Sequence, residues 1–396
     1  MADLRRTLGL VLAAVAACGD DGSGDETTVA TMTGGATDAA TGGPAATTGD
    51  TTAPTGGDAT GEAPSGTTAE GPTSGAATTE VDMTTGSVEM PDGSFIAVGD
   101  GGRRARSIDG ETWEMVIGSG LLDTDEEAAA PDGLRALAVG DGYVVAVGGG
   151  GTHWTSNSRI MRSTDAGATW TDDVLAGVDN FPHSKLYGVA ASGQTVVAVG
   201  VRGRRIRSVD GGQTWADVSF EDQNARLLGV AALGATFVVV GWTEDSYEAP
   251  KTSAILASAD DGATWGPVDE SFARLDAIAA GSGVFIAIGA GLCLRSSDGV
   301  AWVDCGVLTS EFQSVTHIGD EFVLVTLEGL ATSPDGVTWS TPELPVYGAP
   351  KALARGNGRY AGVRWTDRGW AEDLTGWTYS SHATEPLRAI VFVPTP

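Results

Sequence analysis

Short apolar stretches recur from residue 94 to the end of the chain, separated by polar, glycine-rich turns. This pattern predicts many short strands joined by tight turns. One set of stretches, which we name strand A, has Gly, Ala or Ser at its third position, as the crowded innermost strand of a ring requires. Strand A is expected at residues 134–138, 186–190, 227–231, 275–279, 312–316, 350–354 and 387–391. Strand B is the apolar run that follows, as at 143–147 and 284–288.

A polar box recurs between these stretches: Ser, then Asp two residues later, then Gly, then Trp. Glycine after the aspartate permits a positive φ in a tight hairpin, and the Ser and Asp side chains can bind amides of the turn. We therefore expect the boxes to be structural. The boxes lie at Asp109 and Trp113, Asp165 and Trp170, Asp210 and Trp215, Asp260 and Trp265, Asp298 and Trp302, and Asp335 and Trp339, with a degenerate copy at Asp373 and Trp377.

The boxes resemble the Asp-box repeat of bacterial neuraminidases, a resemblance that covers about three quarters of the chain. Their tryptophans lie 37 to 57 residues apart, which is the spacing of four-stranded propeller blades. Seven boxes and seven A strands predict an all-β chain with a seven-bladed β-propeller at residues 92–396. The first unit begins at strand B, residues 95–98, and the last is a lone strand A, residues 387–391. Pairing these two pieces closes the ring.

The N-terminus has the features of an export signal at residues 1–17. Arg5 and Arg6 precede an apolar stretch that ends in Val15-Ala16-Ala17-Cys18. This end resembles the bacterial lipobox, which implies a lipid anchor on Cys18 and a place in the cell envelope, at the outer membrane. The alternative is an ordinary secretory signal followed by an unrelated cysteine. No apolar run reaches the roughly 18 residues of a spanning helix.

Residues 18–91 are rich in Thr, Gly, Ala and Asp, and contain no aromatic residue. Such a segment buries too little apolar surface to offset its chain entropy, so it is expected to be a disordered tether. The whole chain has a net charge of −29, which argues against a nucleic-acid partner. Cys293 and Cys305 flank the turn at Gly299 symmetrically. They are expected to form a disulfide, with two packed thiols as the alternative.

Strand alternation places the A–B and C–D turns, with the boxes, on one face of the ring. We name this the box face. The opposite face holds the B–C and D–A connections, and we name it the loop face. Its connections are long, acidic and dotted with aromatics, which favours recognition; solvated loops with packing aromatics are the alternative. The candidate binding residues are His153, Trp154, Phe181, His183, Trp242, Glu244, Asp245, Tyr247, Glu248 and Tyr347.

Blade texture resembles the non-catalytic propellers of photosystem II assembly factors, which implies binding of other proteins. We expect non-catalytic binding of a protein or surface glycan, by a monomer without a cofactor. The four histidines lack metal-site spacing, so no metal is expected. A glycoside hydrolase, sialidase-like or acting on another polysaccharide, is the alternative, because loop carboxylates could form its catalytic pair. The Phe-Arg-Ile-Pro segment common in sialidases is absent, and seven blades differ from their usual six.

Overall fold

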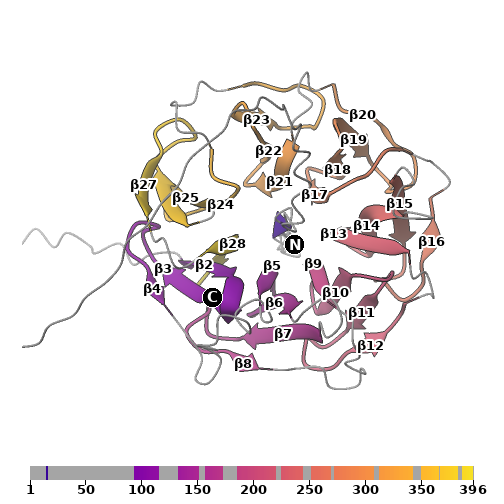
Figure 1. Ribbon diagram of the computed structural model, residues 1–396, viewed down its shortest axis with the longest axis horizontal. Coiled ribbons are helices and arrows are strands. Elements are labelled where there is room, and N and C mark those ends of the chain that lie inside the picture. The colour runs from indigo at the N-terminus through magenta and orange to yellow at the C-terminus, as the bar shows by residue number, and fades with distance from the viewer. Residues whose placement is uncertain are drawn as a thin grey trace, which may run out of the picture. The chain divides into compact units, whose positions relative to one another are not determined.

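The computed structural model describes residues 15–16, 93–115, 133–150, 157–172, 185–219, 224–243, 251–268, 272–306, 312–341, 349–364, 366–381 and 386–395. Their strands form seven separate antiparallel sheets arranged around a ring, which confirms the seven-bladed propeller (Figure 1). The candidate anchor Cys18 and the proposed tether lie outside the described residues. In the part of the chain that is described, no helix is long and apolar enough to cross a membrane.

Each blade runs from an innermost strand A to an outer strand D. Blade 1 consists of β28 (Leu387–Pro394), β2 (Gly93–Gly99), β3 (Arg104–Ser107) and β4 (Glu114–Met115). Blade 2 consists of β5 (Leu134–Gly140), β6 (Tyr143–Gly150), β7 (Asn157–Ser163) and β8 (Thr171–Asp172). Blade 3 consists of β9 (Leu186–Ser192), β10 (Thr195–Gly200), β11 (Arg205–Ser208) and β12 (Ala216–Asp217). Blade 4 consists of β13 (Ala225–Leu233), β14 (Thr236–Thr243), β15 (Thr252–Ser258) and β16 (Gly266–Pro267).

Blade 5 consists of β17 (Ala277–Gly281), β18 (Val284–Gly289), β19 (Leu292–Ser296) and β20 (Val303–Asp304). Blade 6 consists of β21 (Phe312–Ile318), β22 (Glu321–Thr326) and β23 (Leu330–Ser333). Blade 7 consists of β24 (Ala352–Gly356), β25 (Arg359–Arg364), β26 (Asp367–Ala371) and β27 (Thr378–Ser381). The outer strand of blade 6 is reduced to a single bridge between Thr332 and Ser340. The two-residue strand β1 (Val15–Ala16) also pairs with β5.

The ring closes as the sequence predicts, because β2 pairs with β28 from Gly93 opposite Pro394 to Gly99 opposite Leu387. The neighbouring blade supports this joint. Asn357 of blade 7 donates from Nδ2 to the carbonyls of Gly93 at 3.0 Å and Ile108 at 2.7 Å. Both chain ends are therefore built into one blade, and no sheet in the ring is left with a missing inner strand.

The core is divided among the seven seams between blades. Each seam holds one cluster of buried aliphatic and aromatic side chains drawn from two neighbouring blades. Phe237, Phe285 and Phe322 are among the largest fully buried side chains. Burying one such side chain stabilises a fold by about 1.5–3 kcal/mol, so each blade depends on both of its neighbours.

The boxes hold the C–D turns together by local hydrogen bonds. In blade 3 the Ser208 hydroxyl donates to Asp210 at 2.7 Å and accepts the Gly212 amide at 2.8 Å. The Asp210 carboxylate also accepts the Thr214 amide at 2.9 Å. Gly212 has φ +83°, a backbone conformation that favours glycine. The expectation that the boxes are structural agrees with this geometry.

Candidate functional site

The loop face is uneven, because two blades extend their B–C hairpins beyond the others. In blade 4 the pairing of β14 with β15 continues to Thr243 opposite Thr252. In blade 2 the pairing of β6 with β7 continues to Gly150 opposite Asn157. Blade 5 turns much earlier, with Gly289 opposite Leu292. The connections at 151–156 and 244–250 therefore start from raised strand ends on either side of blade 3.

Trp242 is the one predicted binding residue within the described part of the chain. It lies on β14 and is 5% exposed. Lys251 Nζ lies 4.4 Å from its ring centroid, and the Arg226 guanidinium carbon lies 5.1 Å from it. Trp242 thus packs beneath cations instead of standing exposed on the surface. The other nine predicted residues lie outside the described residues: His153, Trp154, Phe181, His183, Glu244, Asp245, Tyr247, Glu248 and Tyr347.

A β-bulge recurs at the loop-face end of strand A, and sequence analysis did not predict it. The register of strand A shifts at its second residue in β5, β9, β13, β21 and β28. In blades 5 and 7 the ladder starts only at Ala277 and Ala352, two residues later than expected from the sequence. A bulge redirects a side chain at the rim of a sheet. The residues at this second position are Arg135, Tyr187, Leu228, Asp276, Gln313, Lys351 and Arg388.

A glycine at the end of strand B makes room for the bulge. A Cβ added at Gly148 would lie 2.0 Å from the Gly133 carbonyl oxygen, and one at Gly241 would lie 2.0 Å from the Arg226 carbonyl oxygen. A backbone oxygen cannot yield as a flexible side chain can. The signal was present in the sequence, because a glycine follows the apolar run at Gly99, Gly148, Gly200, Gly241 and Gly289.

Charged side chains at the channel mouth are held in pairs. Arg388, on the innermost strand of blade 1, binds both carboxylate oxygens of Asp100, with Nη2 to Oδ2 at 2.8 Å. Arg274 Nε donates to one carboxylate oxygen of Asp276, the residue directly before the ladder of blade 5. Away from the channel, Arg204 Nη1 lies 3.6 Å from Asp217 Oδ2 on β12, the outer strand of blade 3. The two-point contact of Arg388 with Asp100 fixes both the position and the orientation of these two charges.

An aromatic ring fixes two further cations across the seam between blades 2 and 3. Tyr187 is the bulged residue of β9. The guanidinium carbon of Arg135 lies 5.2 Å from its ring centroid and Lys185 Nζ lies 5.8 Å from it. A cation within about 6 Å of an aromatic face is attracted to it. The described strand ends on the loop face thus carry several cations held in fixed positions, although the connections of this face are acidic in sequence.

The box face uses its cations differently, because they join blades together. An arginine in strand C donates to a box carbonyl of the next blade in four seams. Arg106 bonds Ala166 at 3.2 Å, Arg162 bonds Gly211 at 2.7 Å, Arg207 bonds Asp261 at 2.6 Å, and Arg295 bonds Asp335 at 2.9 Å. These arginines act on backbone oxygens that the fold itself provides, so they contribute to the ring and not to a ligand site.

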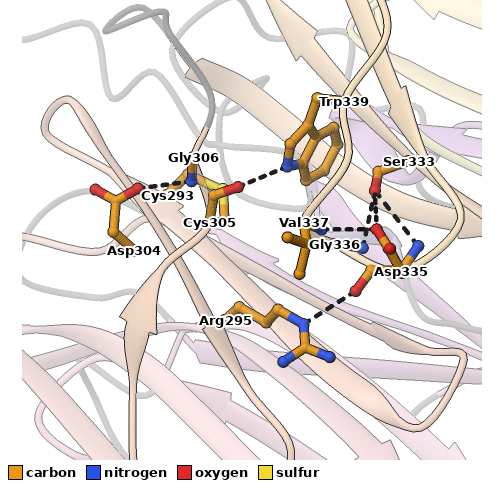
Figure 2. The surroundings of a disulfide bond; sticks show 10 residues. All are labelled: Cys293, Arg295, Asp304, Cys305, Gly306, Ser333, Asp335, Gly336, Val337 and Trp339. Atoms are coloured by element: carbon orange, nitrogen blue, oxygen red, sulfur yellow. Dashed lines mark hydrogen bonds between the residues drawn. A yellow bond between two sulfur atoms is a disulfide. The ribbon is translucent and has the colours of Figure 1, made fainter.

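A disulfide joins Cys293 and Cys305 at the loop-face end of blade 5 (Figure 2). Their Cα atoms lie 5.4 Å apart, and the Cys305 amide donates to the Cys293 carbonyl at 2.9 Å. The Trp339 indole of blade 6 donates to the Cys305 carbonyl at 2.8 Å. Trp265 and other box tryptophans bond a carbonyl of their own box instead. The disulfide-linked strand of blade 5 is thus also tied to blade 6.

The described residues show two features that bear on metal binding and acid–base chemistry. They contain no group of three or more His, Cys, Asp or Glu side chains placed to hold a metal ion. Among the box aspartates, hydrogen bonds from Thr264 and Ser258 lower the pKa of Asp260 to about 2. The amides of Thr338 and Val337 likewise lower the pKa of Asp335. A general acid of a glycosidase needs the opposite shift.

No family model matches the chain, and no curated protein matches it. Its structure is similar to that of YCF48 bound to a D1 peptide, with a TM-score of 0.47 and 19% identity over 62% of this chain and 80% of that one. It is also similar to a GH74 xyloglucanase from Xanthomonas campestris, with a TM-score of 0.48 and 16% identity, over 77% of this chain and 55% of that one. A nidogen/laminin complex matches with a TM-score of 0.44 and 11% identity, over 76% of this chain and 97% of that one.

Proposed function

We propose that this chain is an exported, lipid-anchored binding module whose propeller recognises a protein or glycan of the cell envelope through its loop face, without catalysis. The observation that carries the proposal is the pairing of charges at the channel mouth. Asp100 and Asp276 are each bound by an arginine, Arg388 and Arg274. A surface with its charges already placed needs little rearrangement to bind a partner.

The same pairing argues against the glycoside hydrolase alternative. Canonical glycosidases use two carboxyl groups on either side of the scissile bond, and one of them must carry a proton. Asp100 and Asp276 each accept a hydrogen bond from an arginine, so their carboxylates already have a partner within the protein.

The anchor and tether follow from the sequence. A lipid on Cys18 would hold the chain at the membrane. If residues 18–91 behave as a random coil, their typical end-to-end distance is roughly 45 Å, which sets how far the propeller can move from the anchor. Labelling the exported protein with an alkyne fatty acid tests this part. Label is expected on the native chain and not on Cys18→Ser, and a native chain without label would refute the anchor.

Site-specific photocrosslinking on cells tests the binding face. A photoreactive residue replaces Lys251 on the loop face in one variant and Gln213 on the box face in the control; both positions are exposed. We expect position 251 to give a discrete crosslinked species, and position 213 to give the same species in much lower yield. Equal yields from both positions would contradict recognition by the loop face.

Hydrolysis assays on a polysaccharide panel test the enzyme alternative with the same full-length protein. The variants Asp100→Asn and Asp276→Asn remove the paired carboxylates one at a time. We expect no turnover by the native chain. Turnover that either variant abolishes would replace the binding proposal with a glycosidase.

A further inference from the structure

The innermost strand of blade 2 is paired on both of its edges. On one edge β5 pairs with β6, as every strand A pairs with its strand B. On the other edge β5 pairs antiparallel with β1, with Val15 opposite Leu137 and Ala16 opposite Ala136. A segment from before the proposed tether is thus added to blade 2 as a fifth strand.

The position of β1 is the central channel of the ring. Besides β5, it lies close to β9, β13, β17, β21 and β28, which are the innermost strands of five other blades. A segment that approaches six of the seven innermost strands can only run between them. Figure 1 shows β1 at the centre of the ring, beside the label of the N-terminus.

Channel-facing edges have the chemistry to bind an extended chain. A strand with a neighbour on one side leaves a row of backbone N–H and C=O groups on the other. An extended peptide can satisfy these groups by strand addition, in which main-chain hydrogen bonds supply the affinity. In this channel β5 is the strand whose free edge is used, at Ala136 and Leu137.

We propose that the channel-facing edge of β5 is a strand-docking site, and that its occupant is this chain's own leader around Val15–Ala16. Residues 15 and 16 precede Cys18, so cleavage before Cys18 would empty the channel. This consequence rests on the processing at Cys18 proposed above: the unprocessed chain would keep β1 on the edge of β5, and the anchored chain would leave that edge unpaired. This inference concerns the channel wall and goes beyond the proposed recognition by the loop face.

Disulfide trapping tests the docking in the full chain, produced without export so that the leader is retained. In a Cys18→Ser background, Ala16→Cys is combined with Ala136→Cys on β5. The matched control combines Ala16→Cys with Ala352→Cys, the equivalent strand A position on β24. Mass spectrometry of oxidised protein is expected to find the 16–136 link at least tenfold more abundant than the 16–352 link. Comparable yields would overturn the site on β5.

Hydrogen exchange gives a second readout that needs no new cysteine. Val15→Pro removes a backbone donor and disfavours strand pairing at this position. In the native full chain an amide at Ala136 or Leu137 is expected to exchange at least tenfold more slowly than in Val15→Pro, while β24 amides stay unchanged. Identical exchange in both chains would refute docking, whatever the outcome of the loop-face crosslinking.

Discussion

The box face and the loop face are built from the same seven blades but use polar residues in different ways. On the box face, polar side chains bind the backbone: Ser208 and Asp210 hold their own turn, and Arg207 holds the next blade. On the loop face, polar side chains bind one another. Arg388 pairs with Asp100, and Arg274 pairs with Asp276.

The difference shows which face is free to vary. Backbone acceptors exist in every blade, so the box residues that bind them recur from blade to blade. Side-chain pairs need a particular partner in each blade, and the second position of strand A accordingly changes from Arg135 to Tyr187 to Asp276 around the ring. The box face maintains the ring, whereas the loop face carries what distinguishes one blade from another.

The largest effect is expected where the loop face meets the strand framework. Gly241→Ala would place a Cβ 2.0 Å from the Arg226 carbonyl oxygen, so backbone must shift. We expect a loss of about 3 kcal/mol or more in the free energy of unfolding, measured with denaturant. Gly266→Ala in the same blade is the control, since its Cβ would meet nothing within 4 Å. Equal stability of the two variants would show that the bulge tolerates a side chain.

Removing the disulfide tests whether the loop-face end of blade 5 needs its covalent link. Cys293→Ala with Cys305→Ala opens a short loop with a sequence separation of 12. Loop-closure entropy predicts a loss of about 3 kcal/mol, seen as a lower unfolding midpoint. The control compares the unfolding midpoint of the native protein, measured by denaturant titration, with and without a reductant. A variant as stable as the oxidised protein would mean that the Trp339 contact alone holds this strand.

A single box hydroxyl is expected to matter less than the disulfide. Ser208→Ala removes the acceptor of the Gly212 amide, and both residues are buried. Leaving a buried donor without a partner costs about 1–3 kcal/mol. Thr252→Ala on the loop face is the control, because its hydroxyl is exposed and bonds only the Thr243 hydroxyl among the described contacts. If both variants lose the same stability, the contrast between the faces is wrong.

The smallest effect is the acid dependence of the boxes. Because hydrogen bonds lower the pKa of Asp260 from 3.8 to about 2, the folded state favours its carboxylate. Its contribution is fully present above pH 4 and is lost as the pH falls toward 2. Asp260→Asn is therefore expected to flatten the decline of the unfolding midpoint between pH 4 and pH 2. An unchanged decline would mean that other carboxylates dominate it.

Blade number, box geometry and ring closure could be predicted from the sequence because each depends on local or repeated signals. Strand A and the boxes recur, and the N-terminal strand lacks an inner partner that the C-terminus supplies. The pairing of Arg388 with Asp100 could not be predicted, because it joins residues 288 positions apart. Trp242 is an aromatic beside a loop in sequence, yet Lys251, the residue before β15, covers it.

Closure of the ring by β2 and β28 also determines when during synthesis the first blade can be completed. Strand β2 is the first blade strand to be synthesised, but its inner neighbour β28 is among the last. Until then its edge is open to other chains. Contacts of such long range slow folding, because most of the chain must be in place before they form. The ring is therefore most exposed to aggregation before β28 is in place, and a chain that ends before residue 387 would keep this open edge.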